Sequence, residues 1–289
     1  MPDIDISRVV LITGCSSGIG QATAWRLQGR GWRVYATARR VETLAPLQAI
    51  GCRVLPLDVE QDASMQAAVE TIAAECGGIG ALVNNAGYSQ SGAIETVPMA
   101  SIRRQFETNV FGAIRLAQLV LPGMRARRQG RIVTVGSMGG RFSLPGGGIY
   151  HATKHALEAV SDSLRFEVAG FGIRVVLVQP GLIRTQFSAA ASASLEGIRT
   201  PAAGPYGAFT EEVERITRET YVSGSLARFG GPPEAVAEVV ERALSVRDPK
   251  PRYRVTPSAH VLMALRALLP DRMWDAFLSR TYIRPGARD

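Results

Sequence analysis

Residues 8–20 read Arg8-Val-Val-Leu-Ile-Thr13-Gly14-Cys-Ser-Ser-Gly-Ile-Gly20. The first six are mostly apolar and rich in β-branched side chains, which is typical of a short buried strand. Glycines at positions 14, 18 and 20 then stop the strand, and Gln21–Leu27 is compatible with a helix. The stretch therefore predicts a strand, a glycine turn and a helix in immediate succession.

Strands and helices continue to alternate along the chain. Gly31 marks the end of the first helix and Arg33–Thr37 is the next apolar run, so the first β-α-β unit is about 30 residues long, as a parallel crossover requires. Further strand-like runs lie at 53–57, 81–83, 131–135 and 173–178, with a last edge strand at 253–256. The alternation predicts an α/β fold, a Rossmann-like doubly wound parallel sheet in three α/β/α layers, formed by residues 1–289 as a single domain.

Two long helices and two less regular regions complete the prediction. Residues 101–124 and 151–168 carry apolar stripes at helical spacing, which we interpret as core packing against the sheet. The alternation fails over residues 188–231, which we expect to form a substrate loop or lid. The tail 257–289 is expected to be a C-terminal helical extension that caps the core. Its apolar run is too short to span a bilayer, so covering a substrate pocket or peripheral membrane contact are the alternatives.

Composition restricts the class of protein. The chain has 289 residues, of which 46% are hydrophobic and 20% charged, which is ordinary for a globular protein. Cys15, Cys52 and Cys76 are scattered, and the first residues lack the basic region of a signal peptide, so a cytoplasmic location is expected. The net charge of +8 raises a nucleic-acid hypothesis. The arginines are dispersed, however, which favours attraction toward an anionic cofactor, or a solvated basic face, and no nucleic-acid partner.

The glycine turn predicts a phosphate-binding site. Between a strand and a helix, glycines let the backbone approach a pyrophosphate, and the helix N-terminus offers free N–H groups. After the second strand come Arg39 and Arg40, with no acid before Glu42. An acid there would hold the ribose hydroxyls of NAD, whereas arginine suits the additional phosphate of NADP. We therefore expect NADP(H) to be preferred over NAD(H), and one of the two arginines to be only a surface charge.

Tyr150 and Lys154 are four residues apart, so on a helix they share one face. Tyrosine ionises near pH ~10, and a neighbouring ammonium group favours its phenolate. Ser137 ends the preceding apolar run and could donate a hydrogen bond to a substrate oxygen. The spacing alone is a weak motif, but the three side chains together suit proton transfer at an alcohol or ketone oxygen.

The ordered set of motifs resembles a classical short-chain dehydrogenase/reductase. The matching elements follow the family's order across residues 8–186 and are Thr13–Gly20, Leu57–Val59, Asn84–Gly87, Asn109, Ser137, Tyr150 with Lys154, and Pro180–Thr185. Each element is weak by itself, whereas the set is highly specific. Within the family, the pattern is most similar to the hydroxysteroid and retinol dehydrogenase branch.

The resemblance implies roles for the matched residues. Tyr150 would exchange a proton with the substrate oxygen, Lys154 would favour its ionisation and hold the nicotinamide ribose, and Ser137 would orient the carbonyl. Asn109 would hold a water that joins Lys154 to solvent, at a kink of its helix. The expected cofactor contacts are Gly14, Ser16, Ser17, Gly18, Ile19, Gly20, Arg39, Arg40, Asp58, Val59, Asn85, Ala86, Gly87, Tyr150, Lys154, Pro180, Gly181, Ile183 and Thr185.

Other polar residues have simpler interpretations. His151 and His155 lie four apart on one helix, but no third ligand is evident, so no metal site is expected. Cys15 lies beside a helix N-terminus that could lower its pKa, yet a small residue that fills the turn is the simpler account.

The substrate is expected to be apolar. Residues 139–148 are rich in glycine and suggest room for a large ligand, while residues 188–195 with Phe187, Phe209 and Tyr221 could form an apolar lid. This pattern is compatible with a lipid, steroid, retinoid or long-chain ketone and does not choose among them.

Two main hypotheses follow. The first is an NADP(H)-dependent oxidoreductase that interconverts an alcohol and its ketone or aldehyde by hydride transfer. The second is a regulatory protein that senses NADP(H) without catalysis; the complete set of Asn109, Ser137, Tyr150 and Lys154 favours chemistry instead. A basic nucleic-acid-associated protein is a third and weaker hypothesis. The resemblance also implies a homodimer or homotetramer, formed through the two long helices.

Overall fold

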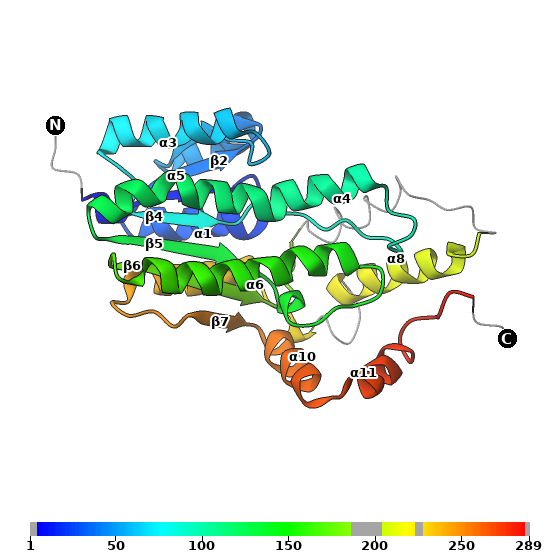
Figure 1. Cartoon of the computed structure of the whole chain (residues 1–289). Helices are drawn as coiled ribbons and strands as arrows, with labels where there is room; N and C mark the ends of the chain where they lie inside the picture. The colour runs from blue at the N-terminus through cyan, green and yellow to red at the C-terminus, as the bar shows by residue number, and fades with distance from the viewer. Residues whose placement is uncertain (1–4, 186–203, 223–227, 287–289) are drawn as a thin grey trace.

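The computed structural model describes residues 5–185, 204–222 and 228–286. Its centre is a parallel sheet with the strand order β3-β2-β1-β4-β5-β6-β7 (Figure 1). The strands are β1 (Val9–Ile12), β2 (Arg33–Ala38), β3 (Arg53–Pro56), β4 (Ala81–Asn84), β5 (Gly130–Val135), β6 (Ile173–Pro180) and β7 (Arg252–Val255). Every strand expected from the sequence is present, and β7 lies at the edge as predicted.

Helices cover both faces of this sheet, which gives the predicted three layers (Figure 1). One face carries α1 (Gly18–Gly29), α2 (Ala45–Ala49) and α9 (Pro233–Ser245). The other face carries α3 (Asp62–Cys76), α5 (Gly112–Ala126) and α6 (Gly148–Ala169), with α4 (Met99–Phe106) extending from α5. Short helical turns are η1 (Ile6–Arg8), η2 (Val41–Leu44), η3 (Glu107–Phe111) and η4 (Met138–Gly140).

The central strand β1 shows why the sheet is buried on both sides. Val10 and Ile12 belong to the core beneath α1 and α9, whereas Val9 and Leu11 belong to the core beneath α3 and α5. All four are completely buried, because successive side chains of a strand point to opposite faces. Each such burial contributes about 1.5–3 kcal/mol, so the short apolar run is enough to hold the sheet between its helices.

The long helix predicted at 101–124 is present but is not uniform. It runs through α4, η3 and α5, and η3 is a π-helical turn that contains Asn109. A π-turn inserts one extra residue and locally widens the helix, and such turns often mark functional positions. A π-turn is one recognised cause of a helix kink, such as the one expected at Asn109.

The region predicted as a lid is only partly described. Residues 204–222 contain α8 (Gly207–Val222), whereas residues 188–195 and the side chains of Phe187 and Tyr221 lie outside the described part. Phe209 of α8 is buried in a cluster with Ala93 and Val213. Within the described residues, we find no helix that is both long and apolar enough to cross a membrane.

The C-terminal extension forms α10 (Pro257–Leu268) and α11 (Asp271–Leu278) at the end of the sheet beyond β7 (Figure 1). Met263 and Trp274 from these helices pack with Met138, Phe142 and Leu182 in a separate apolar cluster. The extension thus covers the segments that follow β5 and β6.

The strand order reverses direction between β1 and β4. In an open parallel sheet, the loops that follow two such strands separate and leave a crevice at their carboxyl ends. The ends of β1, β2, β3, β4, β5 and β6 all open toward this crevice, and the predicted motif residues follow these strands directly.

Candidate functional site

The glycine turn closes the crevice at the end of β1. Gly14 and Gly18 have φ angles of +70° and +59°, a conformation that L side chains rarely adopt. A Cβ at Gly14 would also lie 2.9 Å from the Cα of Ala86. Gly20 needs to be glycine for a different reason, because a Cβ there would overlap the carbonyl oxygen of Gly14. Gly20 therefore packs against the turn and does not line the cleft itself, and its expected cofactor contact stays a prediction.

Thr13 and Asn85 lock this turn to the end of β4. The Thr13 hydroxyl oxygen accepts hydrogen bonds from the backbone N–H groups of Asn85 and Ala86, both at 3.0 Å. In return, the Asn85 amide nitrogen donates to the carbonyl oxygens of Thr13 at 2.8 Å and Gly14 at 3.1 Å. Asn85 lines the cleft, but its amide nitrogen serves the turn. Sequence reasoning did not assign Thr13 a site role, although its hydroxyl stands directly before the first glycine.

A Thr13→Val variant is expected to lose about 2–4 kcal/mol of unfolding free energy. Valine keeps the shape of threonine but leaves two partly buried N–H groups without an acceptor. An unpaired buried group costs about 1–3 kcal/mol. Urea unfolding of the purified protein measures the loss. Thr13→Ser keeps the hydroxyl and is the matched control, so a serine variant as unstable as the valine variant would assign the effect to the methyl group instead.

The two arginines that follow β2 differ in their position relative to the cleft. Arg39 lines the cleft together with Ser16 and Ser17, and its side chain is exposed to solvent. Arg40 is exposed as well, but it stands at the start of η2, where its carbonyl oxygen accepts a hydrogen bond from Thr43, and it does not line the cleft. This difference agrees with the expectation that one of the two arginines is only a surface charge, and the cofactor contacts of both stay predictions.

Asp58 and Val59 follow β3 on the same wall of the cleft. One oxygen of the Asp58 carboxylate accepts a hydrogen bond from the backbone N–H of Glu60 at 3.1 Å, which orients the carboxylate. Val59 is buried against the start of α5, where a Cβ at Gly112 would lie 2.7 Å from the Cβ of Val59. The structure therefore brings both residues to the cleft, as expected.

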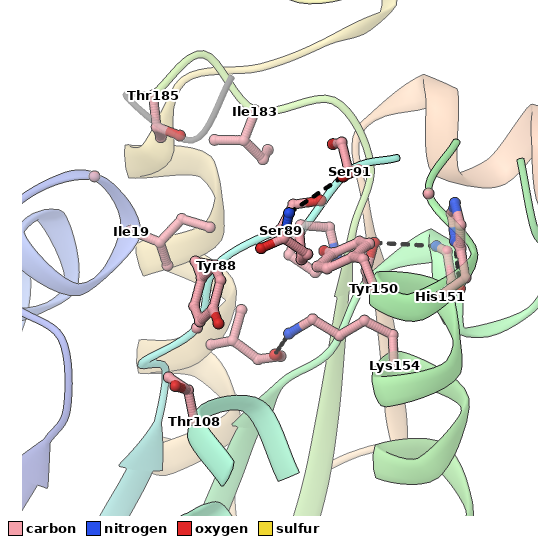
Figure 2. Close-up of a pocket in the computed structure, with 18 of the residues that line it drawn as sticks. Ile19, Tyr88, Ser89, Ser91, Thr108, Tyr150, His151, Lys154, Ile183 and Thr185 are labelled. Atoms are coloured by element: carbon pink, nitrogen blue, oxygen red, sulfur yellow. Dashed lines mark hydrogen bonds between the residues drawn. The ribbon is translucent and has the colours of Figure 1, made fainter. Parts of the chain in front are cut away.

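Ser137, Tyr150 and Lys154 meet on the opposite wall. Ser137 precedes η4, and its hydroxyl oxygen accepts a hydrogen bond from the Gly139 N–H at 3.0 Å. Tyr150 lies in the first turn of α6 and Lys154 one turn later, with the Lys154 Nζ 5.7 Å from the centre of the Tyr150 ring. Figure 2 shows both side chains reaching from α6 toward Tyr88 and Ile19. The predicted helical spacing thus places the phenol and the ammonium in one site.

Burial governs the protonation of this pair. Burial raises the pKa of Tyr150 to about 12, and the hydrogen bond with the Ser137 hydroxyl acts in the opposite direction. Burial also lowers the pKa of Lys154 to about 8, while its Nζ donates to the carbonyl oxygen of Val135 at 2.9 Å. The resemblance implied that Lys154 favours the phenolate. In the protein alone the effect of burial on Tyr150 is larger, so the phenol carries its proton at neutral pH.

Asn109 stands behind the cleft and not in its lining. Its amide nitrogen donates to the carbonyl oxygen of Tyr88 at 2.9 Å and to the Thr153 hydroxyl at 3.1 Å, and its oxygen accepts from the Tyr88 N–H at 3.1 Å. The Thr153 hydroxyl in turn donates to the Tyr150 carbonyl oxygen at 2.7 Å. Asn109 therefore joins the segment after β4 to the first turn of α6. The expected water contact between Asn109 and Lys154 stays a prediction.

One continuous cleft of about 1120 Å³ contains the glycine turn and the Tyr150 pair. Most expected site residues line it, namely Gly14, Ser16, Ser17, Gly18, Ile19, Arg39, Asp58, Val59, Asn85, Ala86, Gly87, Ser137, Tyr150, Lys154, Pro180, Gly181, Ile183 and Thr185. Beyond Tyr150 the cleft is lined by Leu144, by Val213 and Ile216 of α8, and by Tyr282 of the C-terminal segment. Tyr282 could not be found from the sequence, because nothing near it marks a site.

His151, His155 and Cys15 have hydrogen-bond partners within the fold. Among the described residues, no group of three His, Cys, Asp or Glu side chains could hold a metal ion. The Nδ1 atoms of His151 and His155 hydrogen-bond the carbonyl oxygens of Gly139 and His151. Cys15 is completely buried, and burial raises the pKa of its thiol to about 12, so the nearby helix N-terminus does not make it reactive.

Known proteins match this chain over most of its length. Residues 8–196 match the family described as short chain dehydrogenase. The chain belongs to the short-chain dehydrogenase family. It is 37% identical to "Uncharacterized oxidoreductase YbbO" of Escherichia coli (strain K12), with 94% of each chain covered. It is 36% identical to a "3-ketodihydrosphingosine reductase" of Bacteroides thetaiotaomicron, with 92% of this chain and 94% of that protein covered.

The predicted branch receives partial support. The chain is 34% identical to "Retinol dehydrogenase 8" of Bos taurus, with 92% of this chain and 87% of that protein covered. Among solved structures, a short-chain dehydrogenase from Streptomyces avermitilis is 31% identical with a TM-score of 0.76, covering 94% of both chains. A serine dehydrogenase in complex with NADP⁺ is 28% identical with a TM-score of 0.74, covering 86% of this chain and 94% of that one. The protein is thus a Rossmann-fold oxidoreductase that acts on CH–OH donors with NAD(P).

Proposed function

We propose that the protein is an NADP(H)-dependent reductase that interconverts an apolar ketone or aldehyde and its alcohol, with Tyr150 as the general acid and base. The convergence of Ser137, Tyr150 and Lys154 on the cleft that also contains the glycine turn supports this proposal most strongly. A site that only binds a nucleotide needs the glycine turn and the ribose contacts. It does not need a buried phenol beside a serine hydroxyl, whereas a site that transfers a proton does.

The residues of the cleft fit a phosphorylated dinucleotide. The turn at Gly14 and Gly18 has no side chains that would keep a pyrophosphate away, and Ser17 stands at the N-terminus of α1 without a side-chain cap bond of its own. Free N–H groups at a helix N-terminus bind phosphate oxygens. Arg39, with Ser16 beside it in the lining, offers a guanidinium group to the additional phosphate of NADP. When bound there, the cofactor supplies the hydride.

Replacement of Arg39 with aspartate is expected to weaken NADPH binding by about 100-fold and NADH binding by less than about threefold. The variant exchanges a charge-assisted hydrogen bond, worth about 1.5–3 kcal/mol, for repulsion of the phosphate. Calorimetric titration with each cofactor measures both affinities. Arg40→Asp is the matched control, since it changes the net charge equally but lies outside the cleft. Equal losses of NADPH affinity in the two variants would mean that Arg39 acts only through the overall charge of the protein and not through a direct contact.

The residues themselves can perform the proton step of a ketone reduction. Tyr150 holds its proton at neutral pH and can donate it to the substrate oxygen as negative charge develops there. The Ser137 hydroxyl lies beside the phenol and can donate a second hydrogen bond to that oxygen. Lys154 is a buried ammonium group one helical turn away, so it stabilises the phenolate that remains after transfer. In alcohol oxidation, the same groups act in reverse.

The outer part of the cleft supports an apolar substrate. Leu144, Val213, Ile216 and Tyr282 form much of the wall beyond Tyr150. The names of two relatives, a 3-ketodihydrosphingosine reductase and a retinol dehydrogenase, point to long apolar substrates for those proteins. We therefore place a long-chain or polyene carbonyl compound first among the classes to be tested.

The experiment follows NADPH consumption with long-chain 3-ketones, retinal, steroid ketones and short polar ketones, and NADP⁺ reduction with the corresponding alcohols. Turnover of apolar carbonyls with little activity on the short polar compounds would support the proposal. NADPH binding without turnover in either direction would favour the sensor hypothesis. The homodimer or homotetramer and the cytoplasmic location remain predictions; light scattering of the purified protein tests the first.

A further inference from the structure

His151, the residue after Tyr150, is buried and closely packed, although no role was expected for it. Its imidazole is 7% exposed and contacts the Tyr150 ring edge-on, with ring centres 5.6 Å apart. A Cβ at Gly139 would lie 2.5 Å from its Nδ1, and a Cβ at Gly147 would lie 3.0 Å from its Nε2. The ring therefore fits against two glycines, where a side chain would displace it. Such close packing leaves the imidazole little freedom to rotate.

Gly139 connects this imidazole to Ser137. The Gly139 carbonyl oxygen lies 2.9 Å from the His151 Nδ1, and the Gly139 N–H donates to the Ser137 hydroxyl oxygen at 3.0 Å. Because a carbonyl oxygen only accepts, Nδ1 must be the protonated nitrogen of the ring. Burial lowers the pKa of His151, so the ring is neutral at neutral pH. One glycine thus carries a chain of hydrogen bonds from His151 to the serine that contacts the phenol.

The imidazole is also supported from its far side. Phe142 lies 6.2 Å from His151 between ring centres, and Trp274 of α11 lies 5.7 Å from Phe142. Phe142 and Trp274 are both buried, and Trp274 packs further against Phe277. A row of rings thus runs from the C-terminal extension through Phe142 and His151 to Tyr150, and it fixes the imidazole that holds the Gly139 carbonyl.

We propose that His151 is a positioning residue, which through its Nδ1–H bond to the Gly139 carbonyl holds the η4 turn so that the Ser137 hydroxyl faces the Tyr150 phenol. The proposal rests on the proposed reductase function. It assigns His151 no contact with substrate or cofactor. Its effect is on the chemical step, because a displaced Ser137 no longer stabilises charge on the substrate oxygen.

Two substitutions distinguish the hydrogen bond from packing. His151→Phe keeps an aromatic ring but removes the donor, and we expect kcat to fall at least about tenfold while KM for substrate and NADPH changes less than about twofold. His151→Asn places an amide N–H close to the position of Nδ1, and we expect kcat to return to within about threefold of the wild type. His155→Phe, the same change one turn along α6 at an exposed position, is the control and is expected to keep wild-type kcat.

Nitrogen NMR of histidine-labelled protein provides a measurement that does not depend on turnover. His151, assigned with the asparagine variant, is expected in the Nδ1–H tautomer. An Nε2–H tautomer, wild-type kcat in His151→Phe, or an equal loss in His151→Asn and His151→Phe would each overturn the proposal. If the wild type turns over no carbonyl compound, the proposed function fails, and the tautomer alone decides whether the Gly139 bond exists.

Discussion

Tyr150→Phe is expected to lower kcat by about 10²- to 10⁴-fold while NADPH still raises the melting temperature of the protein. A positioned general acid contributes a rate factor of this size, and phenylalanine removes only the hydroxyl group. The ring keeps its contacts with His151 and Lys154, so the first turn of α6 and the lining of the cleft are preserved. The change therefore separates chemistry from binding.

Tyr282→Phe is the matched control for this variant. Both tyrosines line the same cleft, and both lose one hydroxyl group in the comparison, but Tyr282 stands at the outer end with Val213. We expect Tyr282→Phe to change KM for the substrate and to leave kcat within about threefold of the wild type. NADPH oxidation gives the rates, and a thermal shift with NADPH gives binding. Substantial turnover in Tyr150→Phe would require another acid and would contradict the proposed mechanism.

Local patterns in the sequence predict the fold, and the structure confirms that fold. Short apolar runs such as Val9–Ile12 need burial on both faces, which a parallel sheet between helices provides. The positions of Tyr150 and Lys154 also follow from local geometry, because a spacing of four on a helix sets one side chain above the other. Elements and motifs that depend on neighbours in the chain could thus be placed from the sequence.

The remaining features depend on contacts between distant segments. Arg39 and Arg40 are equivalent in sequence, and only the direction of the chain at the start of η2 decides which one lines the cleft. Tyr282 reaches the cleft from the C-terminal segment, which no periodicity predicts. The expectation for Lys154 considered charge but not burial, although burial is the larger effect on the Tyr150 phenol. Such outcomes are set by packing, which a sequence pattern does not specify.

Lys154→Met is expected to abolish turnover and, at neutral pH, to make the protein more stable. Lys154 is 6% exposed, and burial lowers its pKa from 10.5 to about 8. In that interval the unfolded chain binds more protons than the folded one, so stability rises with pH between about 8 and 10.5 and the full penalty is present below about 8. The penalty is about 3 kcal/mol at neutral pH. Methionine removes this cost but also loses the hydrogen bond to the Val135 carbonyl oxygen, so the net gain is about 1–2 kcal/mol.

The pH dependence of the difference between variant and wild type isolates the buried charge. Urea unfolding without cofactor, measured at intervals from pH 7 to pH 10.5, should show the advantage of Lys154→Met shrinking as pH rises, because the lost hydrogen bond is constant while the charge penalty disappears. Lys250→Met, at an exposed position between α9 and β7 and outside the cleft, should show no such trend. A constant difference across the range would mean that Lys154 is not destabilised by burial. A shrinking difference, together with lost turnover, would show that the fold accepts a destabilising buried ammonium group because the reaction at Tyr150 requires it.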